Sequence, residues 1–191
     1  MNRLNVLLIE GDLNAVLLEK SLKDAGYLCL KTQYGPAFLT LVKESKPDIL
    51  VFNLDTPSKK LLADLQTLYQ QCPLPVIMFT RDGNIDTINQ SIKAEVSAFI
   101  VDGLECSRIN SIIHVAIARF NHQQALNNAL EEARAKLEDR KQLDRAKAIL
   151  IKTQNFSEDE AYHTLRKLAM DRNITLGEMA KNVIAMSELF K

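Results

Sequence analysis

The segment Pro75-Val-Ile-Met-Phe-Thr80 decides the fold, because four apolar residues follow one another within it. Asp48-Ile-Leu-Val-Phe52 has the same character. Nearly continuous apolar runs of this kind are typical of parallel strands that are covered on both faces. We therefore expect a parallel sheet that is buried between two layers of helices.

Strand patterns and helical patterns alternate around these two runs over residues 1–103. Further strands are expected at residues 4–9, 27–32 and 98–101. Between the strands, apolar residues recur at helical spacing, as at Ile85, Ile88 and Ile92, and Gly26 supplies a stop after the first such stretch. Five repeats of strand and helix predict the α/β class, with helices on both faces of the sheet.

The strand signal ends at about residue 104, and no proline follows Pro75. Leu126, Leu130, Ala133 and Leu137 recur at spacings of three and four. This pattern predicts a long helix that packs on the sheet and then continues as a coiled coil between two chains. A single solvated helix is the alternative.

Two capping boxes predict the starts of the last two helices. Ser157-Glu-Asp-Glu160 and Thr175-Leu-Gly-Glu178 each place a hydroxyl three residues before a glutamate. With the end of the long helix, they predict a small all-α domain of three helices. Phe156 precedes the first cap and is expected to staple the start of that helix.

The chain has 191 residues with 24 basic and 24 acidic side chains, so its formal net charge is zero. A balanced charge counts against nucleic-acid binding only if the charge is evenly spread. Residues 140–152 hold five basic side chains and one acidic side chain, and Lys141 and Arg145 repel each other at i,i+4 spacing. Cations without a structural partner favour a phosphate-binding face, with a solvated charged face as the alternative.

Apolar runs in this chain stay shorter than the ~20 residues that a membrane span needs. The N-terminus leads straight into a strand pattern, and we recognise no signal peptide there. We expect a cytoplasmic protein without a membrane partner.

The strand and helix units, with acidic residues after the first strand, resemble the receiver domain of response regulators over residues 4–120. The resemblance implies a CheY-like five-stranded parallel sheet in the order 2-1-3-4-5, with a site at the carboxyl ends of the strands. Receivers bind Mg²⁺ through two acidic residues after the first strand. Here Glu10 and Gly11 take those positions, so one carboxylate is missing, and Asp12 beside them is a partial substitute.

The remaining receiver positions also depart from the family. The phospho-acceptor position falls on Asn53, whose neutral carboxamide does not form an acyl phosphate. Thr80 matches the family, whereas Asp102 stands where the family has a lysine. Asp55 is expected in a surface or turn role, with phosphorylation there as the alternative. The resemblance thus implies a pseudo-receiver with a degenerate pocket, controlled by protein binding.

The tail is similar to the ANTAR domain, the three-helix RNA-binding module of bacterial transcription antiterminators. Small and apolar residues carry the similarity: Ala146-Lys147, Leu150, Ala161, Leu165, Ala169 and Ala180. With the receiver-like half, the whole chain resembles the nitrate-assimilation antiterminator regulators (NasT type). We expect a receiver-like domain at 1–120, a coiled-coil linker helix at 121–139 and the ANTAR domain at 140–191.

The ANTAR resemblance implies that the protein binds hairpins in leader mRNA and is not an enzyme. It implies control by a ligand-sensing partner protein of the nitrate or nitrite type, and a homodimer when active. We expect no catalytic residue, no cofactor and no metal site. The candidate RNA-binding residues are Lys141, Arg145, Lys147, Lys152, Tyr162, Arg166 and Lys167, with packing as the alternative role of Tyr162.

Three other functions compete with this interpretation. The first is a conventional response regulator that phosphorylation activates and that has the same RNA output. The second is a metal-dependent enzyme using Glu10, Asp12, Asp55 and Asp102, which is disfavoured because no Lys or His is expected near the strand ends. The third is DNA binding, for which the tail shows no clear helix-turn-helix spacing.

Overall fold

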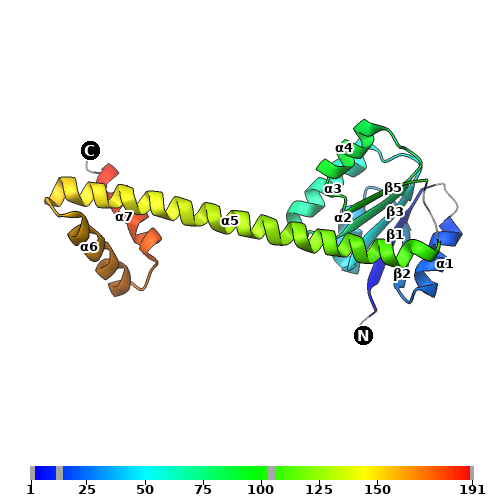
Figure 1. Ribbon diagram of the computed structural model, residues 1–191, viewed down its shortest axis with the longest axis horizontal. Helices are drawn as coiled ribbons and strands as arrows, with labels where there is room; N and C mark the ends of the chain where they lie inside the picture. The colour runs from blue at the N-terminus through cyan, green and yellow to red at the C-terminus, as the bar shows by residue number, and fades with distance from the viewer. Residues whose placement is uncertain (1–2, 12–14, 103–105, 190–191) are drawn as a thin grey trace. The chain divides into compact units, whose positions relative to one another are not determined.

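The computed structural model describes residues 3–11, 15–102 and 106–189. The chain divides into two compact units, Met1–Gln124 and Ala125–Lys191 (Figure 1). The helix α5 (Ile109–Gln154) contributes residues to both units. Within the described residues, no helix is both long and apolar enough to cross a membrane.

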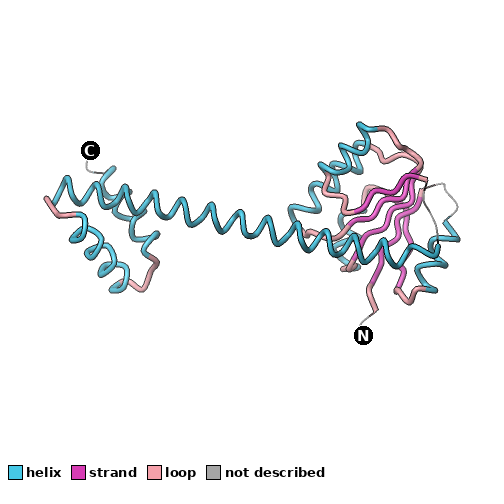
Figure 2. Tube along the Cα trace, in the orientation of Figure 1, coloured by secondary structure: helices cyan, strands magenta, loops and turns pink. Residues whose placement is uncertain are grey.

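The first unit contains a five-stranded parallel sheet in the order β2-β1-β3-β4-β5, as expected (Figure 2). Every residue of β3 and β4 is buried, which confirms the interpretation of the two apolar runs. The strands are β1 (Asn5–Glu10), β2 (Leu28–Gln33), β3 (Ile49–Leu54), β4 (Val76–Thr80) and β5 (Ala98–Val101).

Helices cover both faces of this sheet, because side chains alternate between the faces along each buried strand. On β3, Leu50 and Phe52 pack in a core with α2 and α3, whereas Ile49 and Val51 pack in a second core with α1 and α5. The helices are α1 (Ala15–Asp24), α2 (Phe38–Ser45), α3 (Lys59–Gln71) and α4 (Ile85–Lys93), and a 3₁₀ turn (Cys106–Arg108) precedes α5.

The 46-residue helix α5 changes character along its length. Ile109, Ile113 and Ala116 are buried in the core of the first unit. From residue 128 to residue 141 every side chain is exposed. Leu126 and Leu137 are 52% and 56% exposed, so the apolar stripe predicted for a coiled coil lies on the surface of the single chain. Its pairing with a second helix stays a prediction.

The second unit packs α6 (Glu158–Asp171) and α7 (Leu176–Leu189) with the end of α5. Both predicted capping boxes are present. The backbone N–H groups of Ser157 and Thr175 each donate to the glutamate three residues later, at 2.8 Å. The core is small and rich in alanine, which allows close helix contacts: Ala146, Leu165, Ala169, Met179, Ala180 and Ile184.

Candidate functional site

Polar side chains at the carboxyl ends of β1, β3 and β4 are buried next to one another. Glu10, Asn53 and Thr80 are each less than 7% exposed. The strand register pairs Glu10 with Asn53, and the backbone N–H of Gly11 donates to the carbonyl oxygen of Asn53 at 2.9 Å. The structure therefore brings together these four predicted pocket positions. Asp12, another of the predicted positions, lies outside the described residues.

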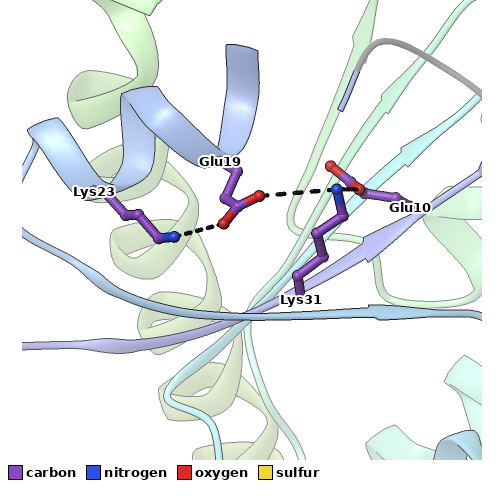
Figure 3. Close-up of polar contacts among 4 residues, drawn as sticks. All are labelled: Glu10, Glu19, Lys23 and Lys31. Carbon is purple, nitrogen blue, oxygen red and sulfur yellow. Dashed lines mark hydrogen bonds and ion pairs between the residues drawn. The ribbon is translucent and has the colours of Figure 1, made fainter. Parts of the chain in front are cut away.

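The carboxylate of Glu10 is already paired with a cation from the same unit. Lys31 on β2 forms an ion pair with Glu10 and lies 3.8 Å from the carboxylate of Glu19 on α1. Glu19 in turn pairs with Lys23 (Figure 3). The hydrogen bond to Glu10 raises the pKa of Lys31, so the ammonium stays charged at neutral pH.

Sequence reasoning missed this chain of alternating charges. The parallel register places Lys31 opposite Leu8, two residues before Glu10 on the same face of the sheet. That contact becomes visible only once the register between β1 and β2 is known. The ion pair with Lys31 engages Oε2 of Glu10, and Oε1 is buried without a hydrogen-bond partner among the described residues.

Thr80 and Asp55 are held by the loop that follows β4. The Thr80 hydroxyl donates to the carbonyl oxygen of Asp55 at 2.6 Å and accepts from the backbone N–H of Asp82 at 3.0 Å. The Asp55 carboxylate is exposed and lies 3.6 Å from the guanidinium of Arg81. The role of Asp55, whether at the surface or as a phosphorylation site, stays a prediction.

The pocket offers little to an incoming phosphoryl group. Asn53 is neutral, and Lys31 already balances the charge of Glu10. Asp102 is exposed with a positive φ of 47° and contributes an acid where a receiver has its lysine. In the part of the chain that the structure describes, no group of three His, Cys, Asp or Glu side chains is placed to hold a metal ion.

In the second unit, the cations predicted to bind RNA fall into two groups. The side chain of Lys147 is only 16% exposed and contacts two carboxylates, Asp144 at 2.9 Å and Glu158 at 2.8 Å. Arg145 pairs with Glu188 at 2.9 Å. The premise that the cations of residues 140–152 have no structural partner is therefore wrong for Arg145 and Lys147, because Asp144 on the same helix, Glu158 on α6 and Glu188 on α7 supply carboxylates.

Lys141 and Lys152, by contrast, are exposed and form no ion pair within the described residues. Their spacing from Arg145 places all three on one side of α5. Arg145 and Lys152 also line a groove of about 760 Å³ between α5 and α7, whose floor includes Ile149, Val183 and Met186.

Arg166 and Lys167 are exposed on α6 and likewise have no ion pair in the described part of the chain. Tyr162 is half-buried, with its ring edge-on to that of His163 at a centroid distance of 5.9 Å. Lys167 lines a pocket of about 390 Å³ with Phe156, Glu160, His163 and Thr164. It shares no lining residue with the groove between α5 and α7.

Phe156 is half-buried and is absent from the side chains that pack against the core of the second unit. It lines the pocket with Glu160, His163, Thr164 and Lys167, which we call the α6 pocket. The capping box holds the start of α6 by hydrogen bonds. The packing of Phe156 as a staple on that helix stays a prediction.

Comparison with known proteins identifies the tail and the first unit. The family model of the ANTAR domain matches residues 131–184, and it begins inside the segment predicted as a linker. The chain is similar to the transcriptional regulatory protein PdtaR of Mycobacterium tuberculosis, with 24% identity over 177 residues that cover 93% of this chain and 84% of that protein. It is also similar to the nitrate regulatory protein of Klebsiella oxytoca, with 34% identity over 68 residues, 36% of this chain and 17% of that protein.

Solved structures show the same fold for the first unit. The receiver domain of a modulated diguanylate cyclase from Desulfovibrio desulfuricans G20 superimposes with a TM-score of 0.55 at 20% identity, over 64% of this chain and 99% of that chain. The chemotaxis protein CheY4 of Vibrio cholerae gives a TM-score of 0.51 at 14% identity, over 59% and 98% of the two chains. The chain therefore joins a receiver fold to a C-terminal ANTAR domain.

Proposed function

We propose that this protein is a signal-responsive transcription antitermination regulator, which binds hairpins in leader mRNA through its ANTAR domain. The match of residues 131–184 to that domain carries the proposal. The relative PdtaR, which spans most of the chain, is itself named a transcriptional regulatory protein. The surface supports RNA binding because Lys141, Lys152, Arg166 and Lys167 are exposed cations without ion pairs among the described residues.

In this proposal, the first unit takes part in regulation without being phosphorylated. Asn53 has no carboxylate for an acyl phosphate, and Asp102 would repel the phosphoryl oxygens. The ion pair between Lys31 and Glu10 already engages the one predicted Mg²⁺-binding carboxylate after β1 that the structure describes. The first unit then serves the docking of a controlling protein, and it supports dimerisation together with the exposed stripe of α5.

The proposed signal is nitrate or nitrite, acting through a ligand-sensing partner protein in the cytoplasm. The name of the Klebsiella oxytoca relative supports this choice, although its similarity is limited to 36% of the chain. The active form is a homodimer joined through the exposed stripe of α5, since Leu126, Leu130 and Leu137 are each about half exposed on the single chain.

A competition experiment tests the RNA output. The full chain is bound to labelled RNA hairpins that share one stem and carry randomised loops, and unlabelled duplex DNA is added at physiological salt. We expect the hairpins to stay bound. Displacement by an equal concentration of duplex DNA would contradict the proposal and favour DNA binding.

A conventional regulator activated by phosphorylation is the second candidate. The exposed carboxylate of Asp55, two residues after Asn53, is the observation that favours it. Incubation with acetyl phosphate and Mg²⁺, followed by intact-mass spectrometry, separates the two. We expect no added phosphoryl group, and a stoichiometric addition that Asp55→Asn abolishes would favour the second candidate.

A further inference from the structure

The α6 pocket is lined by Phe156, Glu160, His163, Thr164 and Lys167. This lining differs from the apolar lining of a void in a hydrophobic core. Four of its five side chains are polar or charged, and the fifth is an aromatic ring. The pocket is a hollow of about 390 Å³ that is widely open to solvent. An aromatic wall among polar groups fits a ligand that is both planar and polar.

The ring of Phe156 is available to such a ligand. The core of the second unit is formed by aliphatic side chains and methionine, and Phe156 is not one of the side chains packed against it. The hydrogen bonds between Ser157 and Glu160 hold the backbone directly after the ring. The ring therefore sits on a fixed backbone, outside the cluster of side chains that forms this core.

Glu160 lines the pocket with a carboxylate. Its Oε2 accepts both hydrogen bonds of the capping box, from the Ser157 backbone N–H and hydroxyl, each at 2.8 Å. These bonds hold the pKa of Glu160 below its ordinary value, so the side chain is a carboxylate at neutral pH. Its Oε1 accepts no hydrogen bond from the described residues and is free to accept one from a ligand.

Lys167 adds a cation to the pocket. It lies on α6 seven residues after Glu160, which is about two helical turns. It is exposed, has no ion pair in the described part of the chain, and lines the same pocket. The pocket thus joins an aromatic face, an anionic acceptor and a cation. The carboxylate disfavours a bare phosphate or an acidic peptide, whereas a nucleotide offers an amino group to the acceptor and a phosphate to the cation.

We propose that the α6 pocket receives one unpaired base of the RNA loop. The base stacks on Phe156, its exocyclic amino group donates to Oε1 of Glu160, and Lys167 contacts the phosphate beside it. This inference rests on the proposed function and deepens it, because it assigns the reading of one loop position to named residues. Adenine, cytosine and guanine carry an exocyclic amino group, whereas uracil offers only its ring N3–H as a donor, so we expect uracil to be disfavoured in the pocket.

The test uses the full chain and a pool of hairpins that share one stem and carry a randomised loop. RNA bound by the protein is sequenced before and after selection. For the wild type, we expect uracil to be depleted at one loop position. Phe156→Leu keeps an apolar side chain but removes the aromatic face, and should weaken binding of the selected hairpins about tenfold.

Glu160→Gln gives the sharper readout. Glutamine is accepted at this position of a capping box, so α6 keeps its cap. Its amide oxygen then takes the cap bonds, and its NH₂ group faces the pocket as a donor in place of an acceptor. We expect the depletion of uracil at that position to disappear or reverse, with other loop positions unchanged.

Glu178→Gln is the matched control, because Glu178 forms the same capping box with Thr175 at the start of α7 and does not line the pocket. It should leave all loop preferences unchanged. If the wild type binds no hairpin, the proposed function itself fails. If it binds selected loops, but Phe156→Leu and Glu160→Gln keep the affinity and the preferences of the wild type, RNA binding stands and the base pocket is refuted.

Discussion

Removing the cation beside Glu10 should destabilise the receiver fold measurably. In Lys31→Met, the carboxylate of Glu10 loses its ion pair while its side chain stays only 3% exposed. Breaking a fully buried pair costs about 3–5 kcal/mol, and breaking an exposed pair costs about 0–1 kcal/mol. The side chain of Lys31 is 41% exposed, so this pair lies between the two limits.

We therefore expect Lys31→Met to lower the free energy of unfolding by about 2 kcal/mol. For a unit of this size, the loss corresponds to a fall in Tm of roughly 6–10 °C. Thermal unfolding of the full chain by far-UV circular dichroism measures it, since the chain has no tryptophan. Amide hydrogen exchange assigns the loss, because faster exchange should be confined to the first unit and strongest in β1 and β2, which the ion pair joins.

Lys23→Met is the matched control within the same chain of charges. Lys23 is 55% exposed and pairs with Glu19 one turn away, so its loss should cost less than about 0.5 kcal/mol. The double variant Glu10→Gln and Lys31→Met should recover part of the stability, because no buried charge is left unpaired. If Lys31→Met costs no more than Lys23→Met, the charge of Lys31 does not hold Glu10.

Further predictions concern both units. Asn53→Asp should destabilise the first unit by about 1–3 kcal/mol, because it adds a buried charge beside which no free cation lies among the described residues. Phosphorylation should not appear in this variant. Unfolding curves measure the stability, and intact mass measures the phosphorylation. Lys152→Ala should reduce the slope of log affinity for RNA against log salt concentration by about 0.7–0.9, as measured by filter binding. Lys147→Ala should leave that slope unchanged and lower the free energy of unfolding by about 1 kcal/mol, as measured by circular dichroism. Acidification should weaken the start of α6, because hydrogen bonds from Ser157 lower the pKa of Glu160 below 4.5. A carboxyl group whose pKa is lower in the folded protein than in the unfolded chain stabilises the fold at pH values above its unfolded pKa. This stabilisation is lost as the pH falls through the folded pKa. The loss of helicity below pH 4.5 should therefore be smaller in Glu160→Gln than in the wild type.

Local patterns in the sequence were sufficient for the architecture. The runs in β3 and β4 are apolar on both faces, so their burial follows from composition alone. The capping boxes at Ser157 and Thr175 place the starts of α6 and α7, because their hydrogen bonds join residues three apart. Such signals need no knowledge of how distant segments meet.

The candidate sites depended on contacts between elements, and here sequence reasoning fell short. The identities of Asn53 and Asp102 indicated that the receiver chemistry was altered. The pairing of Lys31 with Glu10 required the register of β1 against β2. The position of Lys147 between two carboxylates required the packing of α6 beside α5, so a residue expected to face RNA is engaged within the protein.

The ion pair of Glu10 with Lys31 also bears on which substitutions the first unit tolerates together. A carboxylate introduced at position 53 would be an unpaired anion, because Lys31 is engaged with Glu10 and position 102 holds an acid. A lysine introduced at position 102 alone would add a cation without a new anion beside it. The effects of substitutions at positions 53 and 102 should therefore depend on one another, and neither can be judged from the single variant.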